Sequence, residues 1–340
     1  PQSAGANPGP ICYGLGGNEP TISDANLLLG RLDVSKLKSV SETVDLDHIR
    51  AIFQKKLGDP LNVDSETAAA AVLQVAITRM AGATRMVSVS LGEDPRDFSL
   101  FAFGGAGPMH ASALARELGI PEVLVPTRPG ITNALGCIVA DLKHDFVRTI
   151  NSPLNLADMQ EIAAILKAQR DEGLELIRQE PVSIEETRVA HSLDMQFVGQ
   201  THILQVSLPK DQINRESIQL AFDEAYFGRF RVRLPEIRAQ IVNIKTTVTG
   251  RRASICLDGL IDPAGRARSL TKAQIGTRPV WFNGCWRDTQ VFDREALPLD
   301  AKIKGPAVLE QMDTVVLIEP GDEAVSDKDG NILVTLGAAE

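Results

Sequence analysis

The clearest pattern of apolar and polar positions lies between residues 98 and 125. Residues 98–103 form a nearly continuous apolar run, which is typical of a short strand covered on both faces. A glycine turn follows, and from Pro108 to Gly119 the apolar residues recur at helical spacing. Residues 123–125 are apolar again. The pattern predicts a β-α-β crossover, which should be right-handed.

The residues before this unit predict loops and helices. Glycine and proline punctuate residues 1–20, which excludes a helix or a central strand there. Polar residues over 21–24 can cap a short helix, and a second helix is expected over 45–57. A longer helix begins at 64–65, and because its apolar residues lie nearly all the way round, we expect it to be buried on several sides. Periodicity does not decide whether residues 87–90 extend that helix or start a strand.

The character of the chain changes after residue 153. An amphipathic helix is expected over 158–180, and residues 258–278 have the composition of a linker or long loop. The other expected elements are helices over 130–141 and 216–227, and strands over 146–150, 188–198, 202–208, 241–249, 280–282, 289–292, 307–310, 315–318 and 332–335. Asp329-Gly330 is a hairpin-turn signal. We therefore predict an α/β domain over 1–150 and an α+β domain over 151–340 with a β-rich tail over 276–340.

Composition limits the classes of function. The 340 residues are 44% apolar and 23% charged, which fits about two globular domains and excludes wholesale disorder. The net charge of −9 argues against non-specific nucleic-acid binding, which needs clustered cations. No apolar run approaches the roughly 18 residues of a membrane span, so we expect no membrane partner. The chain begins at Pro1 without an initiator Met, which we interpret as a cut end.

Cysteine and histidine positions bear on redox compartment and metal binding. The four cysteines form no Cys-x-x-Cys pair; they are Cys12, Cys137, Cys256 and Cys285. We interpret them as buried, reduced thiols of a cytosolic protein. The five histidines include no pair at i, i+4 spacing, so we predict no metal site within this chain.

One stretch of the chain is strongly basic. Residues 229–278 hold eleven Lys or Arg and three Asp or Glu, a net charge of +8 within an acidic chain. Arg229, Arg231 and Arg233 alternate and would project from one side of an extended segment. The stretch is either a solvated face or a docking surface for an acidic partner or a phosphate.

The turn formed by Gly104, Gly105, Ala106 and Gly107 is the best candidate site. A strand that enters a helix through a glycine turn places free backbone N–H groups and the positive helix end at one point, which suits an anion. The spacing is not that of a dinucleotide-binding turn, because the next strand lacks the expected acidic residue at its end. The Walker lysine is also missing. A tight turn that binds nothing is the alternative.

His110 lies in the first helical turn after these glycines. The positive end of a helix disfavours imidazolium, so we expect a neutral histidine there. It either touches a ligand or only holds the loop in place.

The same residues resemble a known family. Residues 103–111, Phe-Gly-Gly-Ala-Gly-Pro-Met-His-Ala, are similar to a signature of the hydantoinase A/5-oxoprolinase group, which includes the ATP-dependent N-methylhydantoinase A subunit and the acetone carboxylase β-type subunit. Further similar segments are 3–14, 19–26, 128–136, 199–200 and 305–307. The resemblance extends over almost the whole chain. The departures are Met109 in place of the usual Leu and Asn133 in place of the usual Ser.

This resemblance implies part of an actin/hexokinase/Hsp70-like ATPase core over 1–150, followed by the family's C-terminal α+β domain. It implies ATP with Mg²⁺ as cofactor in the full-length protein and contacts to the nucleotide from Gly104, Gly105, Ala106, Gly107 and His110. The family's two phosphate-binding segments precede the region matched by residues 3–14, so the chain is expected to be the C-terminal half of a longer subunit.

The resemblance also implies a function. We expect a cytoplasmic, hetero-oligomeric hydrolase that opens hydantoin or 5-oxoproline rings together with a hydantoinase B-type subunit or domain, and that is inactive as the isolated chain. The alternatives are part of an ATP-dependent ketone carboxylase, or a non-catalytic partner-docking module. The sequence identifies no catalytic residues.

Overall fold

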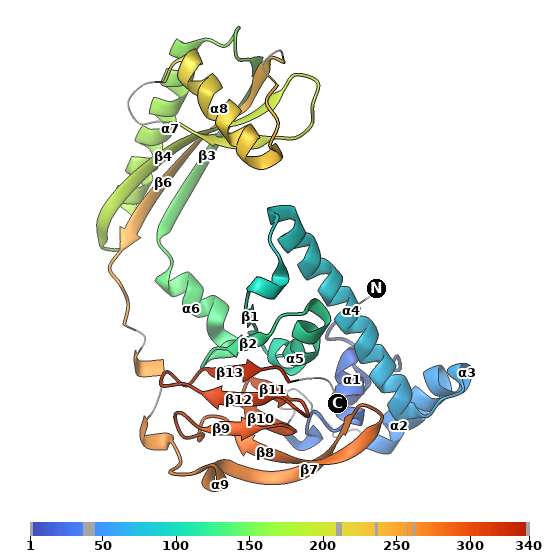
Figure 1. Ribbon diagram of the computed structural model, residues 1–340. Coiled ribbons are helices and arrows are strands. Elements are labelled where there is room, and N and C mark those ends of the chain that lie inside the picture. Colours follow the sequence, from blue (N-terminus) through green and yellow to red (C-terminus); the bar gives the residue numbers. More distant parts are fainter. Residues whose placement is uncertain are drawn as a thin grey trace. The chain divides into compact units, whose positions relative to one another are not determined.

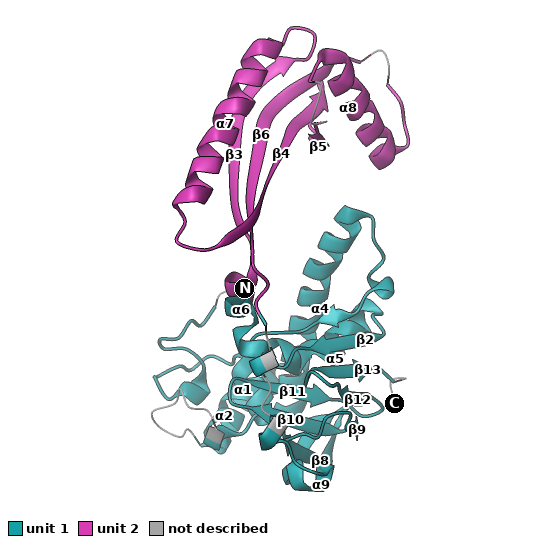
Figure 2. Ribbon diagram, turned by 90° about the vertical axis from the view of Figure 1, so that its left-hand side faces the viewer, with its two compact units in different colours: residues 1–135, 256–340 teal, residues 136–255 magenta. Residues whose placement is uncertain are grey.

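The computed structural model describes residues 3–36, 45–208, 213–234, 237–256, 258–260 and 263–337. The chain forms two compact units, one from residues 1–135 and 256–340 and one from 136–255 (Figure 2). The second unit is therefore an insertion between two stretches that fold together. The sequence predicts two domains that follow one another along the chain, 1–150 and 151–340. That division stays a prediction.

Helices begin the first unit (Figure 1). They are α1 (Ile22–Leu28), α2 (Leu46–Phe53), α3 (Asp59–Leu61) and α4 (Ser65–Leu91). Thr21 and Asp24 form a reciprocal capping box at the start of α1, and the side chain of Asp64 caps α4. Short 3-10 or π turns occupy Ile11–Tyr13, Val34–Lys36, Gln54–Gly58 and Pro95–Asp97.

Helix α4 decides the open question about residues 87–90 and contradicts the expected burial. Residues 87–90 are helical, so the extension is the correct alternative. The expected burial on several sides is wrong, because the Met86 and Val89 side chains are about 70% exposed. The helix packs on α1, α2 and α5 through a face that includes Leu73 and Ile77. Periodicity reports which positions are apolar, but neighbouring elements decide which of them are covered.

A five-stranded sheet contains the predicted crossover. Its order is β1 (Leu100–Phe101), β2 (Glu122–Val125), β13 (Ile332–Thr335), β12 (Glu323–Ser326) and β9 (Lys302–Lys304). Strands β1 and β2 are parallel and α5 (Gly107–Leu118) connects them, which confirms the predicted β-α-β order. Coverage of the first strand on both faces is wrong, because β1 is a two-residue edge strand and Phe101 is 47% exposed.

The tail supplies the rest of the first unit, and its predicted strands are confirmed. A four-stranded sheet has the order β11 (Thr314–Ile318), β10 (Ala307–Gln311), β8 (Cys285–Asp293) and β7 (Gln274–Phe282), and the short α9 (Leu270–Ala273) precedes it. The Asp329-Gly330 turn joins β12 to β13 as an antiparallel hairpin. Because β13 pairs with β2, the tail and the crossover share one core, in which Val125, Leu309 and Ile332 are buried.

The second unit is an antiparallel sheet with two helices. The strand order is β3 (Leu142–Pro153), β6 (Ala239–Arg252), β4 (Ile184–Phe197) and β5 (Leu204–Ser207), with α7 (Met159–Gln179) and α8 (Arg215–Phe230) packed on it. Helix α6 (Thr132–Val139) leads into it. Phe197, Phe222 and Tyr226 form an aromatic cluster in its core.

Two expectations about surface residues are also wrong. Cys12 is buried, but Cys137, Cys256 and Cys285 are exposed. The three alternating arginines do not share an extended segment, because α8 continues through Phe230. Arg231 and Arg233 instead lie over the ring of Phe227, at 5.9 and 4.9 Å from its centroid.

Candidate functional site

The glycine turn lies where β1 enters α5. Gly104 has a φ of +83°, a conformation that glycine adopts without a side-chain penalty. Its N–H donates to the carbonyl of Pro129 at 2.8 Å. The hydroxyl of Thr314 donates to the carbonyls of Gly104 and Gly105, at 3.3 and 3.0 Å. These contacts fix the turn from two directions.

The outer side of the turn is open. Gly105, Ala106 and Gly107 are exposed, and a Cβ added at Gly104 or Gly107 would meet nothing within 4 Å. No side chain caps the start of α5 at Ala106. Pro108 has no N–H, and the N–H of Met109 donates to the carbonyl of Ala106 at 3.2 Å, so Gly107 supplies the N–H at this helix end that can donate to an incoming ligand.

His110 faces inward from the first turn of α5. Its ring is 7% exposed, and Nε2 lies 3.4 Å from Nδ2 of Asn26 in α1. Burial, with a smaller contribution from Arg31, lowers the pKa of His110 to about 4. The ring is therefore neutral at pH 7. If Asn26 donates to Nε2, Nδ1 carries the proton. This geometry favours a residue that holds α5 against α1, and a direct contact with nucleotide stays a prediction.

The amino-terminal loop is held by a buried carboxylate. Asp24 is fully buried and accepts from the backbone N–H groups of Ile11, Cys12 and Thr21, at 3.2, 2.8 and 3.0 Å. Sequence patterns assigned Asp24 only to helix capping and missed the bonds to the loop. Burial and the nearby Asp24 raise the pKa of the Cys12 thiol, so it stays protonated and is a poor nucleophile.

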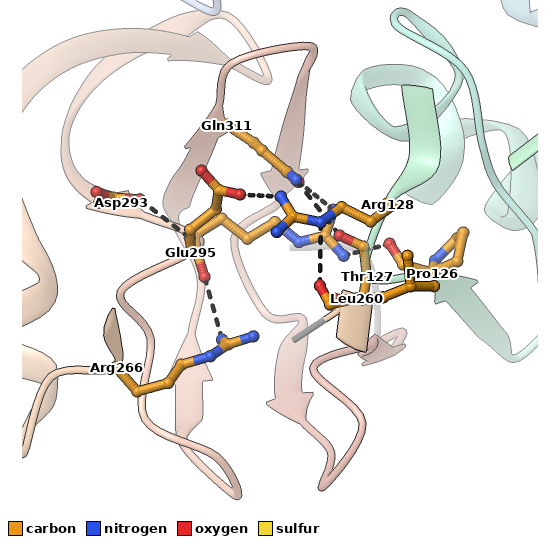
Figure 3. Close-up of polar contacts among 9 residues, drawn as sticks. Pro126, Thr127, Arg128, Leu260, Arg266, Asp293, Glu295 and Gln311 are labelled. Carbon is orange, nitrogen blue, oxygen red and sulfur yellow. Dashed lines mark hydrogen bonds and ion pairs between the residues drawn. The ribbon is translucent and has the colours of Figure 1, made fainter. Parts of the chain in front are cut away.

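A small cavity lies beside the end of β2, close to the residues that support the turn. It encloses about 250 Å³ and is lined by Thr127, Arg128, Gly265, Arg266, Asp293, Arg294, Glu295, Ala296, Gln311 and Gly330. Arg294 donates to the carbonyls of Val125 and Pro126, at 3.2 and 2.5 Å, and to Gln311 at 2.9 Å. Figure 3 shows polar contacts around the cavity, with Arg128 joined to Glu295 and to the carbonyl of Leu260.

Sequence reasoning missed this cavity. Its three arginines come from positions far apart in the chain, and only the strand pairing brings them together. The one available signal was Arg266, which lies within the basic stretch over 229–278. Among the described residues, no three His, Cys, Asp or Glu side chains are grouped so that they could hold a metal ion. Within the same residues, none of the helices has the length and apolar character needed to cross a membrane.

Family models identify the chain along its length. The hydantoinase/oxoprolinase model matches residues 1–146, and the model of the C-terminal domain of that family matches 152–334. The chain belongs to the hydantoinase/oxoprolinase family. The resemblance first noted around Gly104–Gly107 is thereby confirmed.

Similarity to a caprolactamase supports the same assignment. Caprolactamase subunit alpha from Pseudomonas jessenii is 31% identical over 99% of this chain and 49% of the relative. The crystal structure of the ATP-dependent caprolactamase from that organism matches with a TM-score of 0.80 at 30% identity, over 99% of this chain and 50% of that one. This match confirms the predicted mixed α/β fold class.

Two further relatives differ in their named activity. A 5-oxoprolinase from Pestalotiopsis fici is 30% identical over 94% of this chain and 26% of the relative. The acetone carboxylase beta subunit of Xanthobacter autotrophicus is 28% identical over 96% of this chain and 47% of the relative. The chain thus spans half or less of the length of these relatives.

Proposed function

We propose that this family member is the C-terminal half of an ATP-dependent cyclic amide hydrolase subunit, and that the turn over Gly104–Gly107 holds the adenosine side of the nucleotide. The observation that carries the proposal is the open turn with its uncapped α5 terminus. The named activities of the caprolactamase and 5-oxoprolinase relatives support the same reaction class. The ring substrate is a hydantoin, a 5-oxoproline or a related lactam.

The residues of the turn fit a nucleotide. Gly104 and Gly107 leave room for a ligand to approach the backbone, and the N–H of Gly107 at the start of α5 can donate to it. His110 would act by holding the first turn of α5 through Asn26. ATP with Mg²⁺, when bound, supplies the phosphoryl group that makes an unreactive ring amide susceptible to water. The chain's own contribution is to bind and orient the nucleotide.

The isolated chain is proposed to be inactive. The phosphate-binding segments of the nucleotide site would lie in the portion of the relatives that this chain does not match. A hydantoinase B-type subunit or domain would complete the hydrolase. We therefore expect the chain alone to show no ATPase activity and weak affinity for ATP. Calorimetry tests this expectation, and a tight Mg²⁺-dependent ATP signal from the chain alone would contradict it.

A valine at Gly107 tests the nucleotide site in the full-length subunit. The new side chain would enter open space over the turn, whereas one at Gly105 would press on the carbonyl of Asp313 at 3.3 Å. Gly107→Val should therefore reduce nucleotide affinity by about tenfold or more while leaving the fold intact. Gly82→Val is the matched control, because Gly82 is an exposed helical glycine in α4 that also has open space around it. Equal affinity in the two variants would return the turn to the inert alternative.

A ketone carboxylase is the second candidate, because the acetone carboxylase relative matches nearly the whole chain. The two activities are separated by assaying the assembled complex for ATP turnover with hydantoins, 5-oxoproline and caprolactam, and separately with acetone plus bicarbonate. Turnover stimulated by the cyclic amides is expected. ATP turnover that responds only to acetone and bicarbonate would exclude the hydrolase.

A further inference from the structure

We propose that the cavity beside the end of β2 is a phosphate-binding site. It is called here the arginine cavity, and the residues that would contact the anion are Thr127, Arg266 and Arg294. The proposal is independent of the nucleotide site at the glycine turn, because it rests on different side chains. It identifies a role for Arg266, one of the basic residues between 229 and 278.

Two cationic side chains with a buried, unpaired Nε atom are the first observation. Arg294 is 2% exposed, and its Nε has no hydrogen-bond partner among the described residues. The Nε of Arg266 is also buried without a hydrogen-bond partner among those residues. Other nitrogens of both side chains donate to carbonyls, Arg266 to Leu297 at 3.0 Å and Arg294 to Pro126 at 2.5 Å. These carbonyls hold the guanidinium groups in place, and both side chains line the cavity with planar groups of donors, which suit recognition of an oxyanion.

The charge balance of the cavity is the second observation. Arg128 is paired with Glu295, and Asp293 accepts the backbone N–H of Glu295 at 3.0 Å. In the described part of the chain, no carboxylate oxygen lies within salt-bridge distance of Arg266 or Arg294, while Asp313 acts on Arg294 and Glu295 acts on both from farther away. Burial lowers the pKa of Arg294 to about 10, although the nearby Asp313 raises it, so the side chain is still charged at pH 7. Arg294 is a buried cation without a carboxylate at ion-pair distance, which is costly, and a bound phosphate would compensate it.

The shape of the cavity is the third observation. Gly330 has a φ of +71°, and a Cβ added there would lie 2.5 Å from Nη2 of Arg266 and 3.0 Å from Oγ1 of Thr127. The guanidinium edge of Arg266 and the hydroxyl of Thr127 therefore lie close together beside Gly330, at the wall of the cavity. The volume of about 250 Å³ is below that of ordinary pockets for drug-sized ligands, so the cavity suits a phosphate group rather than a whole nucleotide.

Inorganic phosphate is the probe for the first experiment. It is titrated by calorimetry into the chain and into Arg266→Gln at constant ionic strength. Arg268→Gln is the matched control, because Arg268 is exposed and does not line the cavity. We expect saturable binding to the unmodified chain and to the control, and about tenfold weaker binding to Arg266→Gln. The absence of saturable binding, or equal affinity in all three proteins, would overturn the proposal.

A second variant protects the test against misfolding. Arg266→Gln also loses the bond to the carbonyl of Leu297, which could disturb the loop. Thr127→Val removes only the hydroxyl, because the backbone N–H of Thr127 is what binds Asn331, at 2.9 Å. Thr127→Val should weaken phosphate binding severalfold and leave the urea midpoint of the phosphate-free chain unchanged. Unaltered phosphate affinity in Thr127→Val would count against the site.

Competition identifies the source of the phosphate group and separates this proposal from the nucleotide site. If the group belongs to the nucleotide, ATP displaces inorganic phosphate and adenosine does not. If the cavity binds free phosphate, neither ATP nor adenosine displaces it, and the proposal is supported. Adenosine binding that is lost in Gly107→Val but kept in Arg266→Gln would support the glycine turn alone. Phosphate binding that is lost in Arg266→Gln but kept in Gly107→Val would support the arginine cavity alone.

Discussion

The buried neutral state of His110 makes the stability of the first unit depend on pH. The pKa of this histidine is about 4 in the folded chain and 6.5 for a free side chain. The unfolded chain therefore binds more protons between these values, so stability is fully present above pH 6.5 and is lost as the pH falls toward 4. Relative to pH 7.5, linkage predicts a free energy of unfolding lower by about 2 kcal/mol at pH 5, the full effect below pH 4 being about 3 kcal/mol.

Tryptophan fluorescence during urea unfolding measures this loss in the relevant unit. The chain has two tryptophans, Trp281 and Trp286, and both lie in the first unit with His110. Between pH 7.5 and pH 5, the free energy of unfolding should fall by about 2 kcal/mol less in His110→Gln than in the unmodified chain, because glutamine cannot become charged. His48→Gln is the control, because His48 is exposed on α2 of the same unit. If His110→Gln retained the full pH dependence of the unmodified chain, the inference of a buried neutral imidazole would be refuted.

Two other substitutions test the packing of each unit. Asp24→Ala would leave the backbone N–H groups of Ile11 and Cys12 buried without acceptors, so the fluorescence-detected free energy of unfolding should fall by about 3 kcal/mol; a loss below 1 kcal/mol would contradict the buried anchor. Gly173→Ala would place a methyl group into Val248 of β6, so the second unit should lose about 2 kcal/mol by circular dichroism, and an unchanged midpoint would contradict the close approach of α7 to the sheet.

Local features were accessible from the sequence because they are encoded by neighbouring residues. The β-α-β unit was marked by Gly104, Pro108 and Gly119, each of which has a local conformational role. The hairpin at Gly330 was encoded in the same way. Burial was harder to predict. Phe101 and Met86 have the apolar character of core residues, but both are largely exposed, because coverage depends on elements distant in the chain.

The candidate sites show the same division. Gly104–Gly107 is a contiguous motif, so the sequence identified it directly. The arginine cavity joins Arg128, Arg266 and Arg294, which lie on three separate segments. No periodicity or spacing connects them, and their proximity follows from the pairing of β13 with β2 and of β10 with β8. Residues that meet only through such long-range pairing have no signature in a single sequence.

The turn between β10 and β11 links the two sites physically. Thr314 holds the carbonyls of the glycine turn, while Gln311, three residues earlier, accepts from Arg294 in the arginine cavity. Between them, one carboxylate oxygen of Asp313 is buried without a hydrogen-bond partner among the described residues, and a Cβ at Gly130 would overlap the other oxygen. A movement of this turn would therefore change both sites at once. The tail is thus part of the support for the turn after β1, which explains why residues 256–340 fold with residues 1–135 rather than as a separate unit.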